Sequence, residues 1–331
     1  MTALPVIDIG PLLTMDDAAA IEHTAATIGA ASADYGFFYA EGHGIADALF
    51  ERLEAASHAF FALSEAEKAR IAMVHGGTAW RGWFPLGGEL TSGRPDRKEG
   101  LYLGEELGAG DPRVAAGWPL HGPNLWPEGL PELRGAVEDY LAATVAAAEA
   151  LMRGMALALD LAADHFATGI TRHPTLLFRI FHYPPGGAAD DLGVGEHSDY
   201  GLLTLLGQDA HGGLEVRAAD GSWIAVPPRG RALVVNIGDM FERLTRGRFR
   251  SAPHRVINAS GRERLSWPLF YDPDFAASVD PLPIPATTRL LPRWDGGDVH
   301  GAGGTYGEYL IGKVGKVFPE LAGKALGDFT Q

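Results

Sequence analysis

The spacing of apolar residues changes character along the chain. In the first 70 residues it predicts alternating strands and helices, with strands expected at 6–9 and within 35–44 and helices at 16–31 and 45–61. Ser64 followed by Glu67 is a capping-box pattern, which predicts the start of a third helix. Residues 76–130 are rich in Gly and Pro and lack a regular period, which predicts irregular structure that carries or covers a site.

The second half begins with a long helix and continues as a series of strands. Residues 131–162 place apolar side chains on one helical face, at Val137, Leu141, Val145, Ala148 and Met152. Between Leu176 and Asp272, short apolar runs recur about every 10 residues and are separated by Gly, Pro, Asp and Asn. This spacing favours an antiparallel double sheet or barrel over a parallel Rossmann sheet, which needs helices between its strands. The segment TYGEYLIGKVGKVFP predicts a closing helix.

Composition narrows the classes of function. The 331 residues include 27 Lys and Arg and 42 Asp and Glu, so the net charge of -15 disfavours a general nucleic-acid binder. Because the chain has no cysteine, thiol nucleophiles, iron–sulfur clusters and cysteine-bound zinc are excluded, and a metal site must use His, Asp or Glu. The start, MTALPVIDIGPLL, lacks the features of a secretory signal, and charges interrupt the apolar stretch 142–162. We therefore expect a cytoplasmic protein without a membrane partner.

Two histidines and one aspartate form a candidate metal site. His197 and Asp199 lie two positions apart where a loop is expected to become a strand, so both side chains would face the same way. His254 begins another predicted strand 55 positions after Asp199. Two histidines and a carboxylate that leave coordination positions open are the ligand set of non-haem iron(II) oxygenases. A His-x-Asp pair alone is weak evidence, so the interpretation depends on His254 joining it.

A second pair of polar residues follows ten positions after His254. Arg264 and Ser266 alternate along one predicted strand and would share a face. A buried guanidinium beside a hydroxyl is suited to hold a carboxylate, through two parallel charge-assisted hydrogen bonds and a third from the hydroxyl. The alternative interpretation is a surface arginine on a strand.

The chain resembles the iron(II)/2-oxoglutarate-dependent dioxygenases of the isopenicillin N synthase-like group over nearly its whole length. The blocks that carry the resemblance occur in the family's order: LPVIDI, YGFFYAEGHGI, DRKEG, FRIFHYPP, HSDYGLLTLL, GGLEVR, VVNIGDMFERLTRGRFRSAPHRVIN, GRERLSWPLFYDPD and TYGEYL. The resemblance implies a mainly β fold with flanking helices and a double-stranded β-helix, or jelly-roll, core. We expect one large domain, with an N-terminal helical and loop region at 1–130, a spine helix at 131–162, the catalytic core at 170–285 and a C-terminal segment with a helix at 286–331.

The resemblance also implies roles for individual residues. It places iron(II) on His197, Asp199 and His254, and the distal carboxylate of 2-oxoglutarate on Arg264 and Ser266. Tyr183 corresponds to a tyrosine near the co-substrate in several relatives, and Arg179, on the same strand face, is a candidate for an anionic group of the substrate or for a salt bridge at the rim. Relatives often carry an aromatic residue where this chain has Leu265, and a smaller residue where it has Trp267. Asn236 and Asp239 are interpreted as structural.

The implied reaction is oxidation of a small-molecule metabolite by molecular oxygen, by default a hydroxylation, with release of succinate and carbon dioxide. Three alternatives stay open at this point. An isopenicillin N synthase-like oxidase would use Arg264 for a substrate carboxylate and need no 2-oxoglutarate. A zinc hydrolase could use the same three ligands, and a non-enzymatic double-sheet binding protein would need none of them.

Overall fold

Two antiparallel sheets form the centre of the molecule. The computed structural model describes residues 3–186, 192–258, 260–287 and 293–318. The large sheet runs in the order β1 (Val6–Asp8), β2 (Phe37–Glu41), β12 (Leu233–Ile237), β9 (Leu203–Gln208), β14 (Arg264–Asp272), β7 (Thr175–Tyr183), β6 (Glu99–Gly104), β3 (Gly82–Phe84). The small sheet runs β11 (Trp223–Ala225), β10 (Leu214–Arg217), β13 (His254–Ile257), β8 (Leu192–His197). Among the described strands, only β1 and β2 pair in parallel. The expected mainly β, double-sheet architecture is confirmed.

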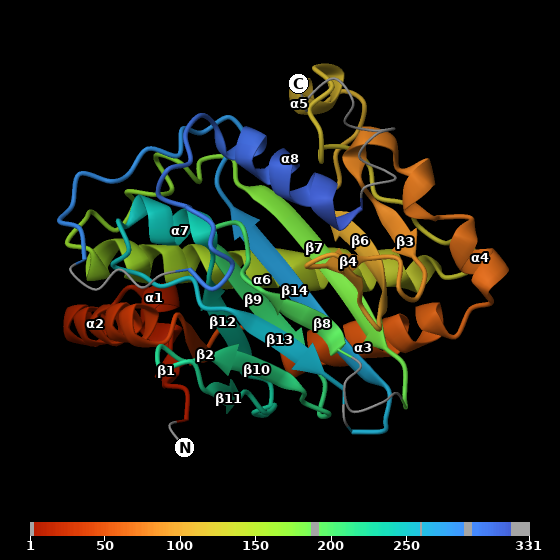
Figure 1. Ribbon diagram of the computed structural model, residues 1–331, viewed down its shortest axis with the longest axis horizontal. Coiled ribbons are helices and arrows are strands. Elements are labelled where there is room, and N and C mark those ends of the chain that lie inside the picture. Colours follow the sequence, from red (N-terminus) through yellow and green to blue (C-terminus); the bar gives the residue numbers. More distant parts are fainter. Residues whose placement is uncertain (1–2, 187–191, 259, 288–292, 319–331) are drawn as a thin grey trace.

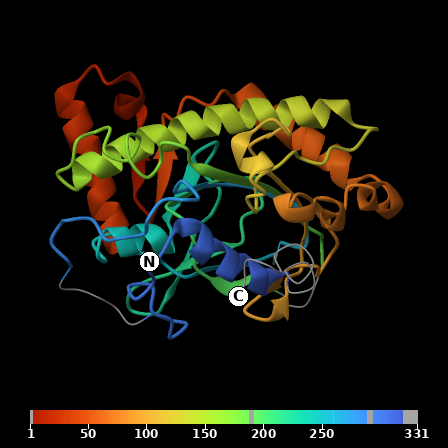
Figure 2. The same ribbon diagram turned by 90° about the horizontal axis from the view of Figure 1, so that it is seen from above.

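Helices cover the side of the large sheet that faces away from the small one (Figures 1 and 2). The spine helix α6 (Pro131–Ala158) runs behind the sheet and packs against α2 (Ala18–Asp34), α3 (Asp47–Phe61) and α1 (Gly10–Thr14). By length and composition α6 could cross a membrane, yet half of its apolar window is buried inside the protein. This burial is what a helix that backs a sheet requires.

Alternation along β14 divides its side chains between two environments. Leu265, Trp267 and Leu269 are fully buried in the core beneath the helices. The indole Nε1 of Trp267 donates a hydrogen bond of 3.0 Å to Ser57 Oγ on α3. The intervening residues, from Arg264 to Asp272, line a cavity between the sheets. Leu265 therefore points away from Arg264, as expected, and Trp267 contributes to packing.

Two further helices, α4 and α8, agree with the sequence patterns. Helix α4 (Glu65–Ala69) begins with the predicted capping box of Ser64 and Glu67. Helix α7 (Asp239–Leu244) follows β12, and α8 (Tyr306–Val317) is the predicted closing helix (Figure 1), which lines the cavity between the sheets with Leu310 and Val314. Residues 288–292 and 319–331 of the predicted C-terminal segment, which include Pro319 of the predicted closing helix, lie outside the described residues.

The prediction of irregular structure for 76–130 is only partly correct. This region supplies β3 and β6, which extend the edge of the large sheet, the hairpin of β4 (Leu90–Thr91) and β5 (Arg94–Pro95), and the short helix α5 (Pro112–Ala115). β6 forms because β7 offers it a partner strand, in a register that sets Tyr102 opposite Arg179. Such long-range pairing leaves little trace in a segment rich in Gly and Pro. The division of the chain at 130, 162 and 285 stays a prediction.

Candidate active site

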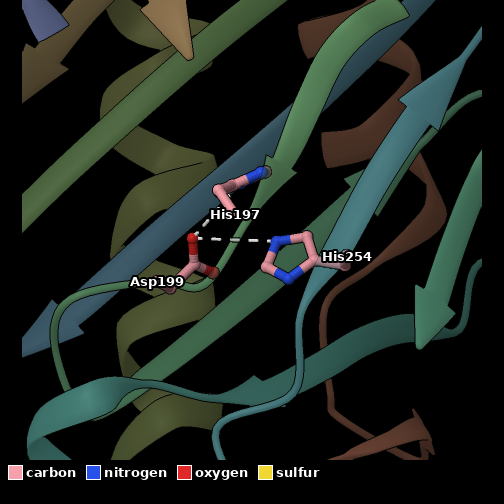
Figure 3. A group of neighbouring side chains, drawn as sticks. All are labelled: His197, Asp199 and His254. Atoms are coloured by element: carbon pink, nitrogen blue, oxygen red, sulfur yellow. Dashed lines mark ion pairs between the residues drawn. The ribbon is translucent and has the colours of Figure 1, made fainter. Parts of the chain in front are cut away.

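The two predicted histidines and the aspartate come together at one end of the small sheet. Strands β8 and β13 pair so that His197 and His254 are direct partners. Their ring centroids lie 4.2 Å apart. Oδ1 of Asp199 lies 3.7 Å from Nε2 of His197 and 3.8 Å from Nε2 of His254. Figure 3 shows the three side chains pointing toward one another, and within the described residues they are the group whose ligand atoms could hold a metal ion.

Both histidines use Nδ1 for a hydrogen bond, which leaves Nε2 of each ring free to bind a metal ion. Nδ1 of His197 bonds to Gly195 O at 2.8 Å, and Nδ1 of His254 bonds to Ala252 O at 3.2 Å. Because a carbonyl only accepts, each Nδ1 carries the proton and each Nε2 keeps its lone pair.

The carboxylate of Asp199 is held in the same manner. Its Oδ2 accepts hydrogen bonds from Thr204 Oγ1 at 2.5 Å and from Asn236 Nδ2 at 2.7 Å. Oδ1 is therefore the oxygen turned toward the histidines. Residues that hydrogen-bond to metal ligands orient these ligands and raise the affinity of the site for the metal.

The charges at the site favour the forms that bind a metal. Burial and then the neighbouring His197 lower the pKa of His254 to about 4, so its imidazole is neutral at pH 7. Burial alone would raise the pKa of Asp199, but His254, His197 and the two hydrogen bonds hold it below its usual value. Neutral imidazoles and an ionised carboxylate are the donors that iron(II) requires.

The structure corrects two points of the sequence interpretation. β8 ends at His197, and β9 begins only at Leu203, so Asp199 lies in the connecting loop and does not share a strand face with His197. The bend of this loop brings the two side chains together. Asn236 was interpreted as structural and Thr204 was not singled out, yet both orient Asp199. They are register partners on β12 and β9, a relation that no local pattern reveals.

The predicted carboxylate clamp lies in the same cavity as the metal ligands. The cavity has a volume of about 490 Å³ and is lined by alternate residues of β14 and β7, among them Arg264, Ser266, Arg179 and Tyr183. Arg264 is fully buried. Its Nη2 reaches Gln208 Oε1 at 3.4 Å, while Nε and Nη1 have no hydrogen-bond partner among the described residues.

Tyr183 supports the position of this guanidinium. It pairs directly with Arg264 across β7 and β14, and the guanidinium carbon lies 4.6 Å from the centre of its ring. Ser266 pairs with Phe181 on one side and Gln208 on the other, so its hydroxyl opens onto the same cavity. A buried cation with two unused donors fits the distal carboxylate of 2-oxoglutarate.

The buried carboxylate of Asp239 connects the loop between β8 and β9 (residues 198–202, the metal loop) to the C-terminal part of the chain. Asp239 donates its backbone N–H to Asp199 O at 2.7 Å, and its side chain accepts hydrogen bonds from Arg293 Nη1 at 2.9 Å and Tyr309 OH at 3.0 Å. Arg293 also donates to Ser198 Oγ at 3.0 Å. α8 and the metal loop therefore meet at Asp239, which was interpreted as structural and has this connecting role.

Comparison with known proteins agrees with this geometry. Residues 4–129 match a model of the N-terminal region of non-haem dioxygenases, described for morphine synthesis, and residues 174–273 match the 2OG-Fe(II) oxygenase superfamily. A probable iron/ascorbate oxidoreductase of Dictyostelium discoideum is 43% identical, with 88% of each chain covered. The chain belongs to the 2OG-Fe(II) oxygenase superfamily. A homoarginine-6-hydroxylase of Arabidopsis thaliana is 35% identical to this oxygenase, over 96% of this chain and 90% of the relative.

Solved oxygenase structures share the fold. A 2OG-Fe(II) oxygenase family protein from Caulobacter crescentus superposes with a TM-score of 0.79 at 28% identity, covering 95% of this chain and 99% of the other. A full-length Neurospora crassa protein, solved in complex with alpha-KG (2-oxoglutarate), gives 0.78 at 25% identity, covering 94% and 95%. The jelly-roll fold, the oxygenase class and the dependence on iron, 2-oxoglutarate and oxygen are thus confirmed. The cytoplasmic location and the absence of nucleic-acid and membrane partners stay predictions.

Proposed function

We propose that this oxygenase hydroxylates a small organic metabolite at a centre built from His197, Asp199 and His254. The observation that carries the proposal is the convergence of two free imidazole Nε2 atoms and one carboxylate oxygen in the cavity that also holds Arg264. In the same proposal Arg264 and Ser266 bind the distal carboxylate of 2-oxoglutarate, and Tyr183 holds the guanidinium in place. When iron(II) is bound by the three ligands, it supplies the activation of oxygen and the oxidation of a C–H bond of the substrate.

The contribution of the chain is to orient its ligands and exclude water. Thr204 and Asn236 keep Oδ2 of Asp199 occupied, so that Oδ1 faces the metal position. On the outer side, the β4–β5 hairpin packs on β8, where Ser92 Oγ donates to Glu196 O at 3.2 Å. α8 covers the other side with Leu310, Val314 and Val317. Apolar cover of this kind restricts access of solvent to the reacting groups.

The proposal is tested by spectroscopy before turnover. Anaerobic addition of iron(II) and 2-oxoglutarate should give a weak visible charge-transfer band in the wild-type protein. The band should be lost in His197→Ala and in Asp199→Ala, while both variants keep the thermal stability of a folded protein. A zinc hydrolase or a simple binding protein would give no band in any of them, and that result would reject the proposal.

Turnover then identifies the substrate. Succinate release should rise when the correct compound is added, and homoarginine belongs in the panel because relatives 34–36% identical to this chain include homoarginine hydroxylases and a 2-oxoglutarate-dependent dioxygenase. The isopenicillin N synthase-like alternative predicts substrate oxidation without any 2-oxoglutarate. Oxidation at full rate in its absence would therefore assign Arg264 to the substrate.

A further inference from the structure

A second buried arginine in the cavity has no carboxylate partner. Arg179 is 6% exposed, and its guanidinium carbon lies 3.5 Å from the centre of the Tyr102 ring. Nη1 donates to Leu103 O at 3.2 Å and to Phe178 O at 3.1 Å. In the described ranges of the chain, no Asp or Glu comes within ion-pair distance of it. A buried cation without a counter-charge is costly, so its retention in a cavity wall calls for an anion from outside the chain.

Another buried guanidinium increases the positive charge behind Arg179. Arg81 is 1% exposed and donates from Nη2 to Leu120 O at 2.9 Å, whereas its Nε and Nη1 have no partner in the described part of the protein. It packs against the end of β6, where a Cβ on Gly104 would lie 2.3 Å from Nη2. Burial, and next the charge of Arg179, lower the pKa of Arg81 to about 9, and the group stays a cation at neutral pH.

The two carboxylates that line this part of the cavity each accept a hydrogen bond from a tyrosine hydroxyl. Glu89 accepts a hydrogen bond from Tyr102 OH and forms a 2.8 Å ion pair with Lys98. Asp272 accepts a hydrogen bond from Tyr306 OH at 2.5 Å, and burial raises its pKa to about 7, so that a large share of it is protonated. Neither group lies within ion-pair distance of Arg179, although the charge of Arg179 lowers the pKa that burial raises in Asp272, and Oδ1 of Asp272 has no hydrogen-bond partner in the described part of the chain.

We propose that Arg179, with Arg81 behind it, binds the carboxylate of the primary substrate, so that the substrate is an organic acid with an apolar body. This rests on the proposed oxygenase function. The two hydrogen bonds of Arg179 to backbone carbonyls both use Nη1, so Nε and Nη2 are the donors that would meet the two oxygens of a carboxylate. The apolar side chains that line the cavity near Arg179 suit the body of such an acid: Leu177, Phe270, Leu310, Val314 and Phe318.

The strand register separates this subsite from the co-substrate clamp. Arg179 lies four residues along β7 from Tyr183, the partner of Arg264, which is about 13 Å at the usual rise per residue. It lies two strands across the sheet from Thr204 and two residues out of line with it, because Thr204 is aligned with Leu177 through Phe270. The separation is about 12 Å at the usual strand spacing and rise, and Thr204 contacts Asp199. Two carboxylates can therefore occupy the cavity together, and the carbon that is oxidised lies several bonds from the substrate carboxylate.

Matched acids and amides test this subsite without turnover. The probes are butyrate, hexanoate, phenylacetate and 3-phenylpropionate, each with its carboxamide, added to the anaerobic protein loaded with iron(II) and 2-oxoglutarate. Binding is read from thermal stabilisation and from the change in the visible band. In the wild type, at least one acid should bind about 10-fold or more tightly than its amide, since a charge-assisted pair replaces a neutral contact. Arg179→Gln should abolish this difference, Arg179→Lys should retain part of it, and exposed Arg172→Gln should behave as wild type.

The outcomes separate this proposal from the oxygenase function itself. The affinity for 2-oxoglutarate should be unchanged in Arg179→Gln, because Arg264 holds that ligand. Equal binding of every acid and its amide by the wild type would overturn the subsite, as would an acid preference that survives in Arg179→Gln. Loss of 2-oxoglutarate binding in Arg179→Gln would reassign Arg179 to the co-substrate. If the wild type gives no charge-transfer band, the oxygenase proposal itself fails.

Discussion

Replacing Arg264 by methionine should stabilise the metal-free protein and abolish its high affinity for 2-oxoglutarate. Arg264 is fully buried, and two of its donor atoms, Nε and Nη1, lack partners among the described residues. An unsatisfied buried donor costs about 1–3 kcal/mol, so the pair costs roughly 2–6 kcal/mol. The cation–π contact with the Tyr183 ring and the 3.4 Å hydrogen bond to Gln208 offset up to about 3 kcal/mol of this cost.

Arg264→Met should therefore raise the stability of the metal-free protein and lower its affinity for 2-oxoglutarate. An apolar side chain of similar volume should raise the free energy of unfolding of the apo protein by about 0–3 kcal/mol. Loss of the buried charge should weaken 2-oxoglutarate binding by about 2–5 kcal/mol, or roughly 30- to 5000-fold in Kd.

Stability is measured by denaturant unfolding of the metal-free protein, and affinity by anaerobic titration of the visible band. Leu265→Met is the matched control, because the neighbouring side chain faces the helices and should change the free energy of unfolding by less than about 1.5 kcal/mol with no effect on Kd. An unchanged Kd in Arg264→Met would refute the clamp. A clear loss of apo stability would refute the reasoning from unsatisfied donors.

Three further substitutions probe the metal loop and its surroundings. Asn236→Ala removes one of the two hydrogen bonds to Asp199 Oδ2, and iron affinity in a chelator competition should fall about 10- to 100-fold; unchanged affinity would contradict an orienting role. Gly201→Ala would set a Cβ 1.4 Å from Asp272 Oδ1, so the loop must move, and both the melting temperature and iron affinity should drop. Burial raises the pKa of Asp272 to about 7, whereas the unfolded chain releases this proton near pH ~4, so this group lowers stability as pH rises from about 4 to 7. Asp272→Asn should therefore gain melting temperature relative to wild type at about pH 8 but not at about pH 4, and a gain that is the same at both would show that the carboxyl is not the cause.

The sequence predicted the fold wherever a helix or strand could be identified from a pattern within its own residues. The apolar face of α6 and the capping box of Ser64 are local patterns, and both appear as expected. The strands from β7 to β14 were also located, with the exception of β8, whose sequence LGVGEH is dominated by glycine and polar residues. β3 and β6 were missed for a related reason, since they are strands only because they extend an existing sheet edge.

The ligand residues could be predicted from sequence, but the reason for their convergence could not. His197 and His254 meet because β8 and β13 pair in one register, which is a contact between segments 57 positions apart. Strand alternation was the wrong argument for Asp199, which a loop carries into place. The orientation of its carboxylate depends on Thr204 and Asn236, which become neighbours only when β9 and β12 pair. Side chains that position a ligand are therefore harder to find from sequence than the ligand itself.

The same interactions that hold the sheets together also assemble the reactive centre. The pairing of β8 with β13 brings the histidines together, and the pairing of β9 with β12 turns Asp199. Asp239 ties the loop between β8 and β9 to α8 through Tyr309, and to the segment before α8 through Arg293. The hydrogen bonds that orient Asp199 are buried, and those of Asp239 to Arg293 and Tyr309 are partly buried. By contrast, Arg264 and Arg179 extend from strands whose neighbours leave their charges without a carboxylate among the residues that the structure describes. The polar groups that position the metal ligands are thus satisfied within the protein, whereas Nε and Nη1 of Arg264 are not, and this difference in hydrogen bonding distinguishes the carboxylate clamp from the residues that orient Asp199.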